Sequence, residues 1–141
     1  MRRHQRIALD SSIFIYQLET NPKYLPLTDV VFSWLAEPAS RAVTAAITMT
    51  EVLVPPYRNQ DQERIDNFYG LLSTYPNLEW ISIDLEVADV AARVRAQYNL
   101  RTPDALQAAA AIHANATALV TNDAAFKRIS EFDVVVLDDF V

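Results

Sequence analysis

The sequence predicts one α/β domain over residues 1–141, with a central parallel sheet of four to five strands flanked by helices. Two observations predict this class. Short apolar runs alternate along the chain with longer segments whose apolar residues recur at helical spacing, which is the pattern of consecutive βαβ units. Hydrophobic residues make up 51% of the 141 residues, which is enough to bury a core in a single domain.

The first half of the chain alternates strands and helices. An unbroken apolar run is typical of a strand buried on both faces of a parallel sheet. Prolines mark connections and the ends of helices. The predicted order is a strand over 7–9, a helix over 12–19, a loop over 21–26, a helix capped by Thr28 and reaching Glu37, a strand over 42–47, and a helix opened by Thr48 and kinked or ended by Pro55 and Pro56.

The second half continues the alternation with clearer helical signals. Apolar residues recur at helical spacing over 61–75 and again over 84–98. Thr102 followed by Pro103 is the pattern of an N-cap with proline at the first helical position. The other predicted elements are strands over 78–83, 118–120 and 134–137, an alanine-rich helix ending at Ala114, and a short helix over 124–129.

Composition excludes several classes of protein. Gly70 is the only glycine, so the chain has no glycine-rich loop for a nucleotide, and the absence of cysteine removes disulfides and thiolate zinc sites. The net charge of -6 is unlike that of a general nucleic-acid binder. No apolar run is long enough to span a bilayer. The basic segment at residues 1–6 is not followed by a signal-peptide pattern, so we expect a cytoplasmic protein without a membrane partner.

Four acidic residues stand where predicted helices begin. Asp10 and Asp123 follow strands, whereas Glu51 and Asp104 lie in first turns. Each acid has an ordinary interpretation as a helix cap or as a first-turn carboxylate that the helix dipole favours. Glu51, for example, would complete a capping box with Thr48.

Together the four acids favour a metal site. The carboxyl ends of parallel strands meet at one edge of the sheet, where α/β proteins bind ligands. Carboxylates gathered there repel one another, which raises the pKa of one or more of them until a cation binds. Because the donors are all hard oxygens, with no nearby Cys or His, we expect Mg²⁺ or Mn²⁺. Such an ion activates water and stabilises charge on phosphorus.

The segments that carry these acids resemble the PIN domain family, and more narrowly the VapC-type toxins of toxin–antitoxin pairs. The segments are Leu-Asp-Ser-Ser-Ile-Phe-Ile-Tyr at 9–16, Thr-Glu-Val-Leu at 50–53, Thr-Pro-Asp-Ala-Leu-Gln-Ala-Ala at 102–109 and Thr-Asn-Asp-x-x-Phe at 121–126. The resemblance covers essentially the whole chain. It implies a single PIN-like domain that cleaves RNA with Mg²⁺ or Mn²⁺, leaves a 5′-phosphate and a 3′-hydroxyl, forms a homodimer and is inhibited by a small antitoxin protein.

The resemblance also implies roles for individual residues. The catalytic acids would be Asp10, Glu51, Asp104 and Asp123, and the expected metal site comprises Asp10, Asp104 and Asp123. Asp10 and Asp104 would be direct ligands, whereas Glu51 and Asp123 would hold a second metal or its waters, or orient the attacking water. The hydroxyls of Ser12 and Thr121 would steady these carboxylates.

Two arginines are candidates for contacting the RNA backbone. Arg58 lies beyond the helix that carries Glu51, and Arg101 just precedes Asp104. A guanidinium suits phosphate because its donors form a planar fork. The alternative for each is an ordinary solvated arginine.

Two other functions stay open from the sequence. Asp10 could be the covalent nucleophile of a phosphatase, although no second Asp lies two residues on, where Ser12 stands. A PIN-like scaffold could also be a catalytically silent binding module whose acids serve only as helix caps.

Overall fold

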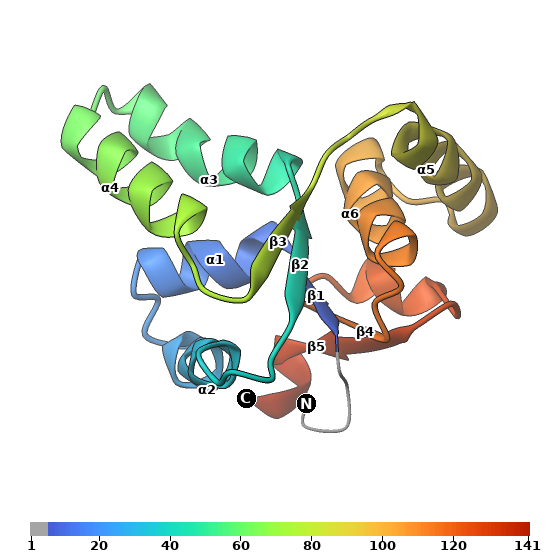
Figure 1. Ribbon diagram of the computed structural model, residues 1–141, viewed down its shortest axis with the longest axis horizontal. Coiled ribbons are helices and arrows are strands. Elements are labelled where there is room, and N and C mark those ends of the chain that lie inside the picture. Colours follow the sequence, from blue (N-terminus) through green and yellow to red (C-terminus); the bar gives the residue numbers. More distant parts are fainter. Residues whose placement is uncertain (1–5) are drawn as a thin grey trace.

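The computed structural model describes residues 6–141, so the basic segment at residues 1–5 lies outside the described residues. The described chain forms one five-stranded parallel sheet with the order β3-β2-β1-β4-β5 (Figure 1). Its strands are β1 (Ile7–Leu9), β2 (Ala42–Ala45), β3 (Leu78–Ile81), β4 (Ala118–Thr121) and β5 (Asp133–Val136). The predicted α/β class with a single parallel sheet is therefore confirmed.

Helices cover both faces of the sheet. They are α1 (Ser11–Leu18), α2 (Leu25–Leu35), α3 (Ile47–Arg58), α4 (Gln62–Ser73), α5 (Leu85–Tyr98) and α6 (Thr102–His113), with two short 3₁₀ helices, η1 (Ala124–Arg128) and η2 (Leu137–Phe140). In Figure 1, α1 to α4 lie on one side of the strands, and α5 and α6 lie on the other. Within residues 6–141, no helix combines the length and the apolar character that crossing a membrane requires.

The central strand β1 contributes to two apolar cores, one on each face of the sheet. Ile7 and Leu9 are buried in the core that includes α1, α2 and α4, whereas Ala8 is buried in the core formed with α5 and α6. This alternation follows from the two-residue period of a strand. The buried alanines of α6 let the helix backbone approach the sheet closely, as its alanine-rich sequence predicts.

The strand order reverses beside β1. The chain places β2 and β3 on one side of β1 and then crosses over to place β4 and β5 on the other. The backbone N–H of Asp10 donates to the carbonyl of Val120 at 3.1 Å, so the pairing of β1 with β4 continues to the end of the strands. Such a switch point is where open α/β sheets bind ligands.

Several predicted helix starts are wrong. Helix α1 begins at Ser11 and not at residue 12, and α3 begins at Ile47 and not at Thr48. Helix α2 begins at Leu25 and not at Thr28, because Pro26 fits a first turn, where no backbone N–H is needed. Thr28 instead lies inside the helix and donates its hydroxyl to the carbonyl of Leu25 at 3.2 Å. Helix α6 begins one residue early, with Arg101 and not Thr102 at the N-cap position.

The proline pair does not end α3, which continues to Arg58. The carbonyls of Pro55 and Pro56 still accept hydrogen bonds from the N–H groups of Asn59 and Asp61, both at 3.0 Å. A proline lacks only the backbone N–H. The pair therefore removes the hydrogen bonds to preceding carbonyls, whereas the carbonyls of both prolines still accept bonds from residues further along.

Candidate active site

Asp10 is the most firmly held of the four acids. It directly follows β1, caps α1, and is only 7% exposed. Its Oδ1 atom accepts the Ser12 N–H at 2.9 Å and the Ser11 hydroxyl at 3.1 Å. Its Oδ2 atom accepts a short hydrogen bond from the Thr121 hydroxyl. Three donors thus fix one carboxylate at the carboxyl end of the central strand.

Ser11 connects Asp10 with Glu51. Its hydroxyl lies 3.1 Å from Asp10 Oδ1 and 3.2 Å from Glu51 Oε1. Ser12, the serine that the sequence nominated, gives Asp10 only its backbone N–H, and its buried hydroxyl has no partner within residues 6–141. Adjacent residues of a helix point about 100° apart, so only one of the two hydroxyls can face Glu51.

Thr121 connects Asp10 with Asp123. Its fully buried hydroxyl donates to Asp10 and accepts the backbone N–H of Asp123 at 3.0 Å. The Oδ1 atom of Asp123 accepts the N–H of Ala125 at 2.9 Å and so caps η1. The capping interpretation is therefore correct for both Asp10 and Asp123, but in each case only one of the two oxygens is needed for the cap.

The capping box predicted for Thr48 and Glu51 is wrong. The Thr48 hydroxyl is buried and hydrogen-bonds the Thr44 hydroxyl at 2.7 Å and the Gln107 amide at 2.8 Å. Helix α3 begins at Ile47, so Glu51 lies beyond the first turn and makes no cap. Its carboxylate is therefore available to the site.

Glu51 carries a raised pKa. Burial contributes most to raising it, and repulsion from Asp10 and Asp104 adds to the effect. Hydrogen bonds from the side chains of Ser11 and Gln107 act in the opposite direction and lower the pKa. Burial without a full set of partners penalises the charged form of a carboxyl group.

Asp104 also has a raised pKa, and its causes include two of the other acids. Burial is the largest cause, and repulsion from Asp123 and Asp10 adds to it, while Arg101 lowers the pKa by charge and by a hydrogen bond. Asp104 thus interacts electrostatically with Asp10 and Asp123, as Glu51 does with Asp10 and Asp104. The fold has brought four acids that are distant in sequence to one edge of the sheet.

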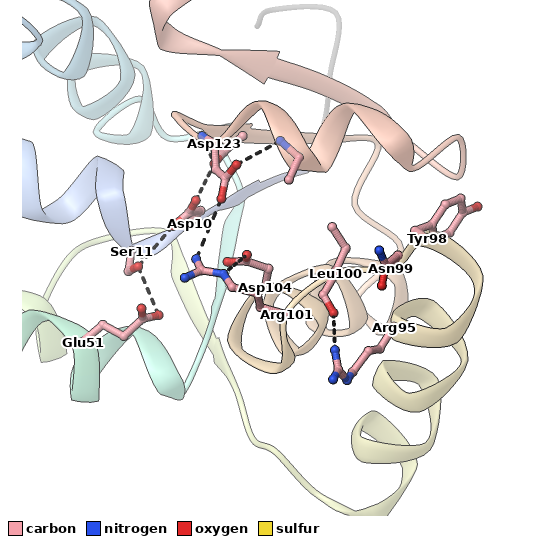
Figure 2. Close-up of polar contacts among 12 residues, drawn as sticks. Asp10, Ser11, Glu51, Arg95, Tyr98, Asn99, Leu100, Arg101, Asp104 and Asp123 are labelled. Atoms are coloured by element: carbon pink, nitrogen blue, oxygen red, sulfur yellow. Dashed lines mark hydrogen bonds and ion pairs between the residues drawn. The ribbon is translucent and has the colours of Figure 1, made fainter.

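Of the two candidate arginines, only Arg101 lies among the acids. Its Nε atom is 3.2 Å from Asp104 Oδ2, and its terminal nitrogen is 3.9 Å from Asp123 Oδ2 (Figure 2). Arg58 is the last residue of α3, about 10 Å along the helix from Glu51. It lines a hollow of about 480 Å³ whose other walls include Met49, Leu53 and Tyr57.

The donor chemistry suits a hard divalent cation, because four carboxylates face one region and two of them have pKa values raised partly by mutual repulsion. The side chains are not yet arranged as ligands, however. Within residues 6–141, no three His, Asp or Glu side chains already form a group that could hold an ion. The Arg101 guanidinium lies between Asp104 and Asp123 and pairs with both.

Two residues of the site, Ser11 and Gln107, are not among those nominated from the sequence. Ser11 directly follows Asp10, and Gln107 lies three residues after Asp104, so that both fall on the same face of α6. The i,i+3 spacing was a usable signal for Gln107. Nothing local indicated which of Ser11 and Ser12 faces Glu51.

The fold and the site together define the class of this protein. It is a parallel α/β domain with an acidic site of four carboxylates at its switch point. The family model of the PIN domain matches residues 7–132, so the chain belongs to the PIN domain family. The resemblance predicted from the sequence is confirmed. No curated protein sequence matches the chain.

Several solved structures share the fold. VapBC-1 from nontypeable Haemophilus influenzae has a TM-score of 0.71 at 22% identity, covering 94% of this chain and 98% of that chain. VapBC2 from Rickettsia felis, bound to a DNA fragment from its promoter, has a TM-score of 0.69 at 20% identity, covering 92% and 96%. VapC20 from Mycobacterium tuberculosis, a sarcin-ricin loop cleaving toxin, has a TM-score of 0.64 at 12% identity, covering 80% and 86%.

Proposed function

We propose that this protein is a metal-dependent endoribonuclease, the toxin of a toxin–antitoxin pair. The observation that carries the proposal is the electrostatic coupling of Asp10, Glu51, Asp104 and Asp123 at the switch point of the sheet. A folded protein that keeps this much negative charge in one place gains from binding a cation there. Membership of the PIN domain family and the fold shared with VapBC structures support the same function.

Asp10, Asp104 and Asp123 would hold Mg²⁺ or Mn²⁺. The bound ion would polarise the scissile phosphate and lower the pKa of the attacking water. Ser11, Thr121 and the Ser12 N–H keep the Asp10 carboxylate in a fixed orientation, which reduces the rearrangement needed when the ion enters.

Glu51 would accept a proton from the attacking water. Its raised pKa makes it a stronger base than an exposed glutamate, and a base works best when its pKa is near the working pH. The products would carry a 5′-phosphate and a 3′-hydroxyl, because the water attacks phosphorus and the 3′-oxygen leaves with a proton.

The RNA and protein partners follow from the same proposal. RNA must approach a chain with a net charge of -6, so local cations at the acidic edge are required. VapC20 is a toxin that cleaves the sarcin-ricin loop, which supports structured RNA as the substrate class. The VapBC neighbours support a small antitoxin as partner. We also propose that the protein is a cytoplasmic homodimer, as the resemblance of the sequence implies.

Asp10→Asn tests the assignment. The variant should lose cleavage of a structured RNA in the presence of Mn²⁺, and the wild type should lose the same activity when a chelator is added. Asp84→Asn is the matched control, because Asp84 caps α5 through Val87 N–H at 2.9 Å just as Asp10 caps α1. If Asp10→Asn cleaves RNA at the wild-type rate, Asp10 is not a catalytic ligand.

A catalytically silent PIN-like binding module is the second candidate, favoured by the observed capping by Asp10 and Asp123. Metal titration separates the two candidates. A nuclease site should raise the melting temperature in millimolar Mg²⁺ or Mn²⁺, whereas acids retained only as caps should leave it unchanged.

A further inference from the structure

Arg101 holds the position of a cation between two of the proposed metal ligands. Its Nε atom contacts Asp104 on α6, and its terminal nitrogen reaches Asp123 after β4 (Figure 2). Among the residues from 6 to 141, no other basic side chain pairs with either carboxylate. One guanidinium therefore offsets the repulsion between two acids from different elements.

The ion pairs of Arg101 with Asp104 and Asp123 can break without disturbing the fold. The Arg101 side chain is 78% exposed, and within residues 6–141 it makes polar contacts only with the two acids. Its backbone is fixed at the N-cap of α6, three residues before Asp104, so the guanidinium can leave by rotation of its own side chain. Exposed ion pairs of this kind are weak, which makes exchange with a divalent ion feasible.

We propose that Arg101 is an exchangeable counter-ion, which occupies the cation position in the metal-free protein and is released toward the RNA phosphate when Mg²⁺ or Mn²⁺ enters. This inference rests on the proposed function. Asp104 and Asp123 each direct one carboxylate oxygen toward the guanidinium, at 3.2 Å and 3.9 Å. A released guanidinium stays tethered beside the site and can bind a phosphate oxygen pair with its fork.

The substitution Arg101→Gln gives two effects of opposite sign. The dissociation constant for Mn²⁺, measured by calorimetry, should fall about threefold to tenfold, because a competing charge has been removed. KM for a synthetic RNA hairpin should rise, because a phosphate contact has been lost. Arg93→Gln is the control, since it also removes a paired arginine, from an ion pair with Glu131 outside the acidic site, and should change neither value.

A loss of folding would weaken the binding of both Mn²⁺ and RNA, and an effect of net charge alone would appear equally in Arg93→Gln. An unchanged or weaker affinity for Mn²⁺ in Arg101→Gln overturns the exchange. Tighter Mn²⁺ binding with an unchanged KM overturns the release toward phosphate. Equal effects in Arg93→Gln overturn both parts, because they would reflect net charge alone.

A spectroscopic titration follows the release directly. The Arg101 Nε–H resonance, assigned by its loss in Arg101→Gln, should shift when diamagnetic Mg²⁺ is added to the wild type. If the wild type binds Mn²⁺ and cleaves RNA but this resonance stays in place, only the exchange is wrong. If the wild type neither binds Mn²⁺ nor cleaves RNA, the proposed function is wrong as well.

Discussion

Gln107→Leu should destabilise the protein in a pH-dependent way. Gln107 is 3% exposed, and its amide donates to the Thr48 hydroxyl at 2.8 Å and also hydrogen-bonds the Glu51 carboxylate. The substitution keeps a similar volume but removes both bonds. It therefore separates a buried hydrogen bond between neutral groups from one that depends on the charge of Glu51.

The expected magnitude follows from these two contacts. Losing the bond to Thr48 costs about 0.5–1.5 kcal/mol, and losing a bond to an ionised carboxylate costs about 1.5–3 kcal/mol. Leucine gains some apolar burial, so the free energy of unfolding should fall by roughly 2 kcal/mol when Glu51 is ionised. When Glu51 is protonated, the loss should be roughly 1 kcal/mol.

Urea unfolding in chelator at about pH 8 and about pH 4 measures this difference, since Glu51 is ionised at the first and largely protonated at the second. Thr48→Val is the matched variant, because it removes hydrogen bonds only to Thr44 and Gln107, which do not titrate. Its loss should be the same at both pH values. If the loss of stability in Gln107→Leu is also the same at both pH values, as in Thr48→Val, Gln107 does not act on Glu51.

Two further predictions concern the metal-free site. The folded pKa values of Glu51 and Asp104 lie above their ordinary values of 4.5 and 3.8, so the unfolded chain loses these protons first. The free energy of unfolding should therefore fall as pH rises through the range in which these two groups ionise. Calorimetry in chelator should show a shallower fall of this free energy for Asp104→Asn. Ser11→Ala should lower stability by about 1 kcal/mol in urea and slow RNA cleavage. Ser12→Ala should change both little, because its hydroxyl has no partner among residues 6–141.

The fold could be predicted largely because its signals are local. The apolar run of β1 has the predicted bounds, and the segments predicted as helical over 61–75 and 84–98 form α4 and α5. The strands predicted over 42–47 and 78–83 end two residues earlier, at Ala45 and Ile81. These two strands were predicted too long because apolar side chains continue into the following turn. The periodicity of the sequence does not mark where strand pairing stops.

The site was less predictable because its details depend on contacts between distant segments. Thr48 does not form a capping box, because its hydroxyl hydrogen-bonds Thr44 on β2 and Gln107 on α6. Arg101 is held partly by Asp123, which comes from another element. Sequence patterns indicate which acids gather at a sheet edge, but the partner of each hydroxyl or guanidinium depends on tertiary packing.

The capping and metal interpretations of the acids are compatible, because a carboxylate has two oxygens. Asp123 caps η1 with Oδ1 and meets Arg101 with Oδ2. Asp10 caps α1 with Oδ1 and accepts the Thr121 hydroxyl with Oδ2. A helix start stabilises a nearby negative charge, so the caps help the fold to tolerate acids that repel one another before an ion binds. Capping thus holds these carboxylates at the edge of the sheet in fixed orientations, which is what a nuclease site would require of them.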